Sequence, residues 1–255
     1  MNLNLPRVKK SPANLLEIDV GKALWQLSWP AMVGMLFQSL TGITDVFFLG
    51  RVQSPEAQAA IGIFGVLAGY LASYNSIIGN GSISVIAQCC GSGRHEEAGK
   101  AAVQTLSLKL FGSILFCVPV FFLLKPLLIL FGATGGALES GIIYGRILCI
   151  AIPLMNTGYS FNTALRAAGD AVTPMFLMLF SLSINLICNV CFILGIYPFP
   201  KMGIAGVALA TLIAQISLFI LGIWVYTRPA SKIRIRLSDF LHPDFTLMKK
   251  IFHIG

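Results

Sequence analysis

Asp45 is the residue of this sequence that packing alone explains least. It lies in the stretch QSLTGITDVFFLGR, Gln38 to Arg51, and no other charged side chain occurs between Ala23 and Gly50. This run is long enough to cross a membrane, where a carboxylate costs about 2.5–3.5 kcal/mol and usually marks an ion or substrate path. Asp45 is therefore a candidate for binding a proton or another cation. The alternative is a functionless acid at a wetted helix end.

Helical spacing adds weight to the first interpretation. Gln38, Thr41 and Asp45 are separated by three and then four residues, so they form one polar stripe on a helix. An acid that merely reaches water from a helix end needs no polar neighbours deeper in the helix. The stripe thus favours a functional role for Asp45.

Three later apolar runs carry similar polar stripes. Their members are Asn156, Tyr159 and Thr163; Ser181, Asn185 and Asn189; and Thr211 with Gln215. Any one of these residues could simply join two helices through a hydrogen bond, which is common between membrane spans. Four stripes together predict a polar cavity inside a helix bundle.

The composition indicates which elements must position these side chains. The chain is 56% hydrophobic and 11% charged, with a mean hydropathy of +0.82, whereas soluble domains carry about 25% charged residues. We therefore expect an all-α integral membrane protein, because uninterrupted apolar runs lack the alternation of a membrane barrel. Six spans are predicted: Ala23–Gly50, Ala57–Gly93, Ala101–Leu124, Ser140–Leu165, Ala171–Pro200 and Met202–Thr227.

The positive charge predicts how the spans are oriented. The net charge of +8 could suggest nucleic-acid binding, but the positions of the basic residues argue against it. Thirteen lie before span one, between spans two and three, after span four or after span six, and the alternate loops hold only Arg51, Lys125 and Lys201. This is a positive-inside bias. We expect a multi-pass protein of the cytoplasmic (inner) membrane with a cytoplasmic N-terminus and lipid, not nucleic acid, as its surroundings.

The same pattern divides the chain into four parts. Residues 1–22 form a polar cytoplasmic segment, and residues 23–227 form the six-helix transmembrane unit. Residues 228–250 are the longest polar connection and read as a cytoplasmic linker. Residues 251–255 begin a new apolar segment that breaks off after a few residues, as a truncated seventh helix would.

Several stretches resemble the multidrug and toxic compound extrusion (MATE) family. LSWPAMVGMLFQSLTGITDVFFLGRV is similar to its first helix, and VIAQCCGSGRHEEAGKAA to its loop between helices two and three. ALRAAGDAVTPM and INLICNVCFILGIYPFPKMGIAGVALATLIAQ resemble the segments that follow. The resemblance implies one lobe of a twelve-helix, two-lobe transporter that lacks its C-terminal lobe. It also implies cation-coupled (H⁺ or Na⁺) antiport, with export of drugs, organic cations or metabolites by alternating access.

The resemblance also assigns roles to residues. Asp45 matches the family's cation-site carboxylate, Asn185 its helix-five asparagine and Thr211 its helix-six threonine. Asn189 departs from members that have a second aspartate there, which puts a two-carboxylate relay in doubt and leaves Asp45 as the only acid. We expect no catalytic residue, cofactor or resident metal. The expected cavity-lining residues are Gln38, Thr41, Asn156, Tyr159 and Gln215.

Three other functions compete with this hypothesis. A flippase for lipid-linked oligosaccharides would need a cationic cavity, and no span offers an arginine cluster. An intramembrane aspartyl protease needs two facing acids. RAAGD is similar to part of its motif, but Ala167 replaces a glycine, and Asp170 is expected at the opposite membrane face from Asp45. The third is a packing subunit with no transport of its own.

Overall fold

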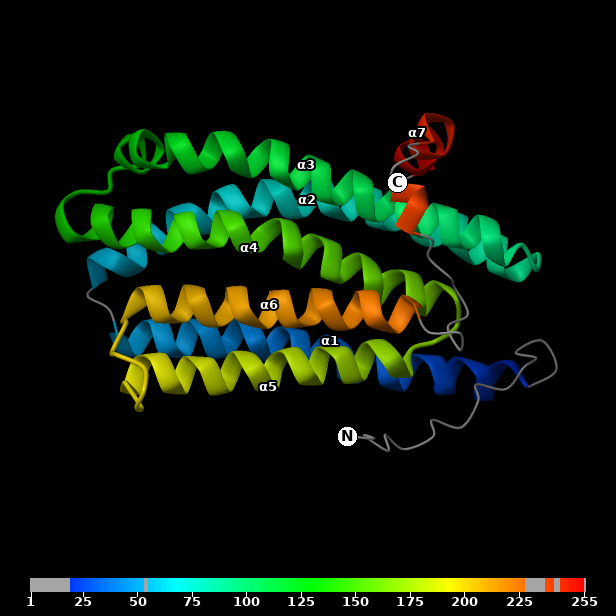
Figure 1. The fold of residues 1–255 in the computed structure, drawn as a ribbon, viewed down its shortest axis with the longest axis horizontal. Coiled ribbons are helices and arrows are strands. Elements are labelled where there is room, and N and C mark those ends of the chain that lie inside the picture. The colour runs from blue at the N-terminus through cyan, green and yellow to red at the C-terminus, as the bar shows by residue number, and fades with distance from the viewer. Residues whose placement is uncertain (1–18, 53–54, 228–236, 241–243, 255) are drawn as a thin grey trace.

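The computed structural model describes residues 19–52, 55–227, 237–240 and 244–254, and within them every regular element is a helix (Figure 1). The six long helices are α1 (Val20–Val52), α2 (Pro55–Gly91), α3 (His95–Leu130), α4 (Gly135–Ala167), α5 (Val172–Leu194) and α6 (Ile204–Thr227). A short 3₁₀ turn, η1 (Leu237–Phe240), and a ten-residue helix, α7 (Phe245–Ile254), follow.

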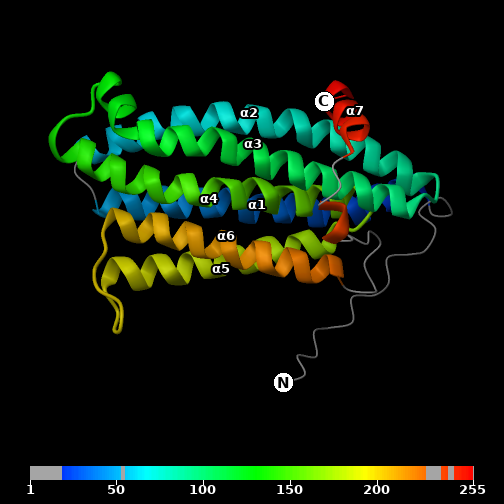
Figure 2. The same cartoon turned by 45° about the horizontal axis from the view of Figure 1, so that its top comes forward.

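The six long helices pack in two groups. Helices α2, α3 and α4 contact one another on one side, and α5 contacts both α1 and α6 on the other (Figures 1 and 2). Contact between α4 and α6 joins the groups. Successive long helices run in opposite directions, so the start of α1, the α2–α3 junction, the α4–α5 junction and the end of α6 share one end of the bundle.

Five of the six long helices, α1 and α3 to α6, are long and apolar enough within the described residues to cross a membrane. Helix α2 is equally long, at 37 residues, and also largely apolar. Its polar side chains Asn75 and Ser82 are buried inside the bundle. Since α2 lies beside α3 and α4, we place it across the membrane with them.

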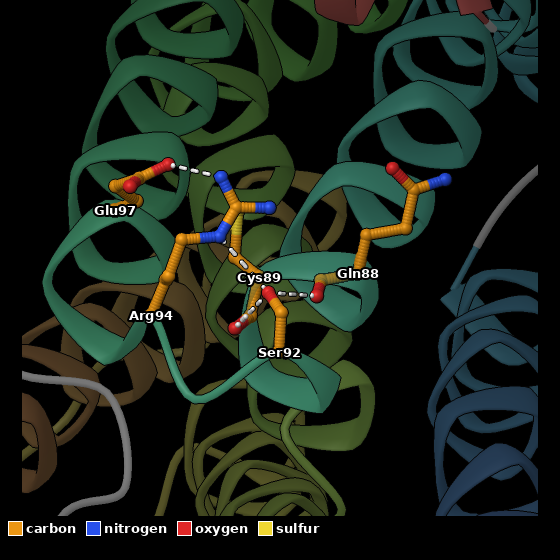
Figure 3. Close-up of polar contacts among 5 residues, drawn as sticks. All are labelled: Gln88, Cys89, Ser92, Arg94 and Glu97. Atoms are coloured by element: carbon orange, nitrogen blue, oxygen red, sulfur yellow. Dashed lines mark hydrogen bonds and ion pairs between the residues drawn. The ribbon is translucent and has the colours of Figure 1, made fainter.

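Side-chain contacts shape the turn between α2 and α3 (Figure 3). The Ser92 hydroxyl donates to the Gln88 carbonyl at 2.8 Å, and Arg94 Nε donates to Ser92 Oγ at 3.0 Å. Arg94 also pairs with Glu97 Oε2 at 3.1 Å, but both side chains are exposed, so the pair adds little stability. Gly93 has a φ of +76°, which glycine adopts without strain. The contacts fix the direction of the turn.

Two element boundaries differ from those expected from the sequence. Helix α1 begins at Val20, inside the predicted segment 1–22, most of which lies outside the described residues. Helix α7 begins at Phe245, inside the predicted linker 228–250, and not at residue 251. The cause is Asp244, whose Oδ1 accepts a hydrogen bond from the Leu247 backbone N–H at 3.0 Å and so starts the helix early.

Candidate cation site

The Asp45 carboxylate lies where three helices meet. Its Oδ1 atom accepts hydrogen bonds from the side-chain amides of Asn185 at 3.0 Å and Asn189 at 3.1 Å, both on α5. Its Oδ2 atom accepts a hydrogen bond from the Thr211 hydroxyl on α6 at 2.9 Å. One acid of α1 therefore connects α1, α5 and α6.

Close packing of α1 against α5 brings these groups together. A Cβ atom at Gly34 of α1 would lie 3.2 Å from the Met178 sulfur and 3.5 Å from the Met175 Cα. Glycine at this position therefore lets the two backbones approach. Three turns further along α1, Asp45 reaches α5 where Asn185 and Asn189, four residues apart, present the same face.

The donors are themselves part of a small network. Asn189 Nδ2 also lies 3.1 Å from Asn185 Oδ1, and both asparagines are fully buried. Thr211 Oγ1 lies 3.2 Å from the Val207 carbonyl as well as 2.9 Å from Asp45. A hydroxyl has a single hydrogen, so Thr211 can donate to only one of these two acceptors at a time. Its hydroxyl therefore has two alternative orientations.

All three donors to Asp45 are neutral. The ion pair between Arg94 and Glu97 lies in the α2–α3 turn. The hydrogen bonds satisfy the carboxylate oxygens but bring no opposite charge to them. Because an unpaired charge is costly in a low-dielectric interior, the arrangement is suited to a carboxylate that a cation neutralises.

Two predicted cavity residues lie near this site. The Tyr159 side chain on α4 is within hydrogen-bonding reach of Gln38 on α1 and within electrostatic range of Asp45. The Thr41 hydroxyl instead donates to the Phe37 carbonyl of its own helix at 3.0 Å. Tyr144 on α4 also lies within electrostatic range of Asp45, and the sequence analysis missed it. Spacing offered no signal, because Tyr144 lies twelve residues before Asn156, or about three and a third turns, and therefore on a different face of the helix.

The other two predicted cavity residues, Asn156 and Gln215, are buried. Asn156 on α4 accepts from Asn75 Nδ2 on α2 at 2.7 Å and donates to Ser113 Oγ on α3 at 2.7 Å. Gln215 is buried on α6, with its Oε1 near Gly158 of α4. Asn156 thus belongs to a separate polar network between α2, α3 and α4.

A family model described as MatE matches residues 30–191, which include Asp45, Asn185 and Asn189. The chain belongs to the MATE family. MATE proteins are transporters and not enzymes. This agrees with the position of Asp170, which caps α5 by accepting from the Thr173 backbone N–H at 3.0 Å. Asn185 lies 15 residues beyond Asp170, about 22 Å along a helix, so Asp170 and Asp45 do not form a protease dyad.

Curated relatives and solved structures agree with this assignment. The chain is 34% identical over 201 residues to the probable multidrug resistance protein YoeA of Bacillus subtilis, covering 78% of the chain and 43% of YoeA. It is 29% identical over 211 residues to the FAD transporter of Shewanella oneidensis, covering 80% and 45%. A MOP superfamily transporter from Pyrococcus furiosus superposes with a TM-score of 0.82 at 28% identity, covering 94% of this chain and 52% of that one.

The chain therefore spans about half the length of the curated MATE relatives it matches. The matched half is the N-terminal lobe, with the six long helices described above.

Proposed function

We propose that this chain is the N-terminal lobe of an exporter of small organic molecules, in which Asp45 binds and releases the coupling cation. The observation that carries the proposal is the contact between the Asp45 carboxylate and three neutral donors on two other helices. A cation at Asp45 would neutralise the charge and change the hydrogen bonds that hold α1 to α5 and α6. Cation binding would thus alter how the helices of the lobe are held together.

A proton requires the smaller rearrangement of the site. When Asp45 is ionised, the Thr211 hydroxyl donates to its Oδ2. When Oδ2 takes up a proton, the new O–H group can donate to Thr211 Oγ1. The Thr211 hydrogen then turns to the Val207 carbonyl, 3.2 Å away. One hydroxyl rotation accommodates the proton and leaves both asparagine amides in place, which favours H⁺ as the coupling cation.

Sodium would require more movement. Hard cations take oxygen ligands, yet both amides direct their N–H groups toward Asp45 Oδ1. To bind Na⁺, the Asn185 and Asn189 side chains would have to turn so that their oxygens face the carboxylate. Asn189 Oδ1, which has no hydrogen-bond partner among the described residues, could then serve as a ligand. Na⁺ coupling is therefore the competing hypothesis that the experiment below must separate.

The second lobe is part of the proposal. Alternating access in repeat-built transporters moves one bundle against another, and a cation drives the change only if it binds the two states unequally. The names of the two relatives, one for multidrug resistance and one for FAD transport, support transport of organic molecules. We propose that the cavity between the two lobes selects the substrate.

The test is export by the full-length protein in cells and in proteoliposomes. Ethidium and FAD serve as probes, each supplied with an outward-directed gradient. In one set of experiments a pH gradient is imposed, and in the other a Na⁺ gradient is imposed. Wild-type protein should respond to the pH gradient, and the Asp45→Asn protein should lose the response. Glu97→Gln, which neutralises an exposed acid far from the site, is the matched control and should export normally. Export unaffected by Asp45→Asn would overturn the proposal, and a response to Na⁺ alone would replace H⁺ as the cation.

A further inference from the structure

Helix α7 lies on the outside of α2 and α3, at the end of the bundle that holds the α2–α3 turn (Figures 1 and 2). Its Ile251 side chain is 0% exposed and belongs to the same buried cluster as Ile86 of α2 and Ala102 and Leu106 of α3. Leu247, one turn earlier on the same face, packs against this cluster. Together Leu247 and Ile251 pack α7 against α2 and α3.

A buried glutamine holds the chain just before this helix. Gln104 of α3 donates from Nε2 to the Asp239 carbonyl at 3.2 Å. Its Oε1 accepts from the Asp244 backbone N–H at 3.3 Å. Both ends of one side chain therefore bind backbone groups of the segment that leads into α7, which holds the start of α7 against α3.

The residue pattern of α7 is similar to the pattern that opens α1. Residues 17–28 read EIDVGKALWQLS, and residues 244–255 read DFTLMKKIFHIG. In this alignment an acid opens both segments, Lys22 matches Lys249, and an apolar-aromatic pair follows two residues later. Val20 then matches Leu247, and Leu24 matches Ile251. Residues 244–255 therefore have the pattern expected for the first helix of a second six-helix unit.

The matching face of α1 has no cover among the described residues. Val20 is 72% exposed and Leu24 is 60% exposed, although their counterparts Leu247 and Ile251 pack against other helices. Gly34 of α1 lies against Met175, close to the start of α5, so the turns from Val20 to Trp29 extend beyond α5, by roughly 15 Å at 1.5 Å per residue. Figure 1 shows this part of α1, in dark blue, beyond the ends of α5 and α6 and at the same end as α7.

We propose that Val20 and Leu24 dock on the second six-helix unit, against the two helices that correspond to α2 and α3 here. This inference rests on the two-lobe exporter proposed above. The first helix of each lobe would then lie across the other lobe, and two such contacts would link the lobes at one end. These contacts would hold that end closed in the state that is open at the other end.

Lipid is the competing occupant for these exposed apolar residues, and the similarity between α7 and α1 discriminates against it. Leu247 and Ile251 have the same apolar character and spacing as Val20 and Leu24, yet they lie against protein. The alignment with α7 also predicts which residue next to Leu24 remains exposed. Phe252 is 55% exposed next to the buried Ile251, so its counterpart Trp25 should remain exposed when Leu24 is covered.

Site-specific photo-crosslinking in the full-length protein tests the docking. p-Benzoylphenylalanine replaces Leu24 in one variant and Trp25 in another, and a protease site is placed between Pro229 and Ala230. After irradiation of membranes and cleavage, the Leu24 variant should keep its two halves joined on a denaturing gel. The Trp25 variant should fall into halves. A variant with the photo-reactive residue at Ile251 is the positive control, because α7 follows the cleavage site and touches α2 and α3.

Each outcome bears on the proposal. A joined product for Leu24 but not for Trp25 supports it, while release of both halves in both variants overturns it. A product joining two copies of the chain, or an adduct with lipid only, also overturns it, as would a gene with no second six-helix unit. Export of ethidium or FAD by the same variants separates the two proposals. Normal export without the joined Leu24 product would overturn the docking proposal and leave the exporter proposal standing. The joined Leu24 product in a protein whose wild type does not export would overturn the exporter proposal and leave the docking proposal standing.

Discussion

Thr211 Oγ1 lies 2.9 Å from Asp45 Oδ2 and 3.2 Å from the Val207 carbonyl, so one hydroxyl stands between a carboxylate and a backbone acceptor. Two substitutions at Thr211 distinguish the effect of the hydroxyl group from the effect of side-chain shape. Thr211→Ser keeps the O–H group and should export nearly as wild type. Thr211→Val removes it and one hydrogen bond to a charged group, worth about 1.5–3 kcal/mol. Export rates should then fall by about tenfold or more, since about 1.4 kcal/mol is a factor of ten.

Initial rates of probe efflux from energised cells at matched expression measure this difference. Equal rates for Thr211→Ser and Thr211→Val would show that the hydroxyl takes no part in proton exchange at Asp45.

Asn189 should matter less than Asp45. Asn189→Ala removes one neutral donor to Asp45 Oδ1 but leaves the Asn185 amide at 3.0 Å and the carboxylate itself. We expect partial export, between wild type and Asp45→Asn, with the pH dependence of export displaced but still present. Efflux rates across a pH series in proteoliposomes check this. Complete loss of pH dependence in Asn189→Ala would mean that the asparagine, and not the carboxylate alone, is required to bind the proton.

Asn156 should act on stability and not on cation coupling. It accepts from Asn75 and donates to Ser113, all three being buried, so Asn156→Ala leaves two polar groups without their partner. Such a loss costs about 1–3 kcal/mol. We expect a lower unfolding temperature of the purified protein, with the pH dependence of the remaining export unchanged. A change in the pH dependence with no loss of thermal stability would place Asn156 in the coupling site.

The sequence was sufficient for the helical membrane fold because that information is local. Long apolar runs and turn residues predicted the six long helices, and Asp45 stood out through the lack of other charges around it. The spacing of Asn185 and Asn189 correctly predicted that they share one face of a helix. Their convergence on Asp45 from another helix is a tertiary relationship. The spacing of residues within one helix does not show which residues of another helix they meet. The expectation that Asn185 belongs to the same site as Asp45 came from the resemblance to MATE proteins.

The limits of the sequence are equally specific. The stripe that contains Asn156 predicted a polar face, but the partners of that face, Asn75 and Ser113, lie on α2 and α3. The start of α7 was missed although its signal is local, an aspartate placed three residues before Leu247. The orientation of the chain in the membrane and the roles assigned to the site residues stay predictions.

Proton release on substrate binding tests the central claim, that Asp45 holds the coupling proton, most directly. The purified full-length protein is mixed with the exported probe, ethidium or FAD, in weakly buffered detergent solution containing a pH-sensitive dye. Wild-type protein should release protons as the probe binds, and Asp45→Asn should bind the probe and release none, while the Glu97→Gln control behaves as wild type. Proton release from Asp45→Asn equal to that of wild type, at equal probe binding, would contradict the claim.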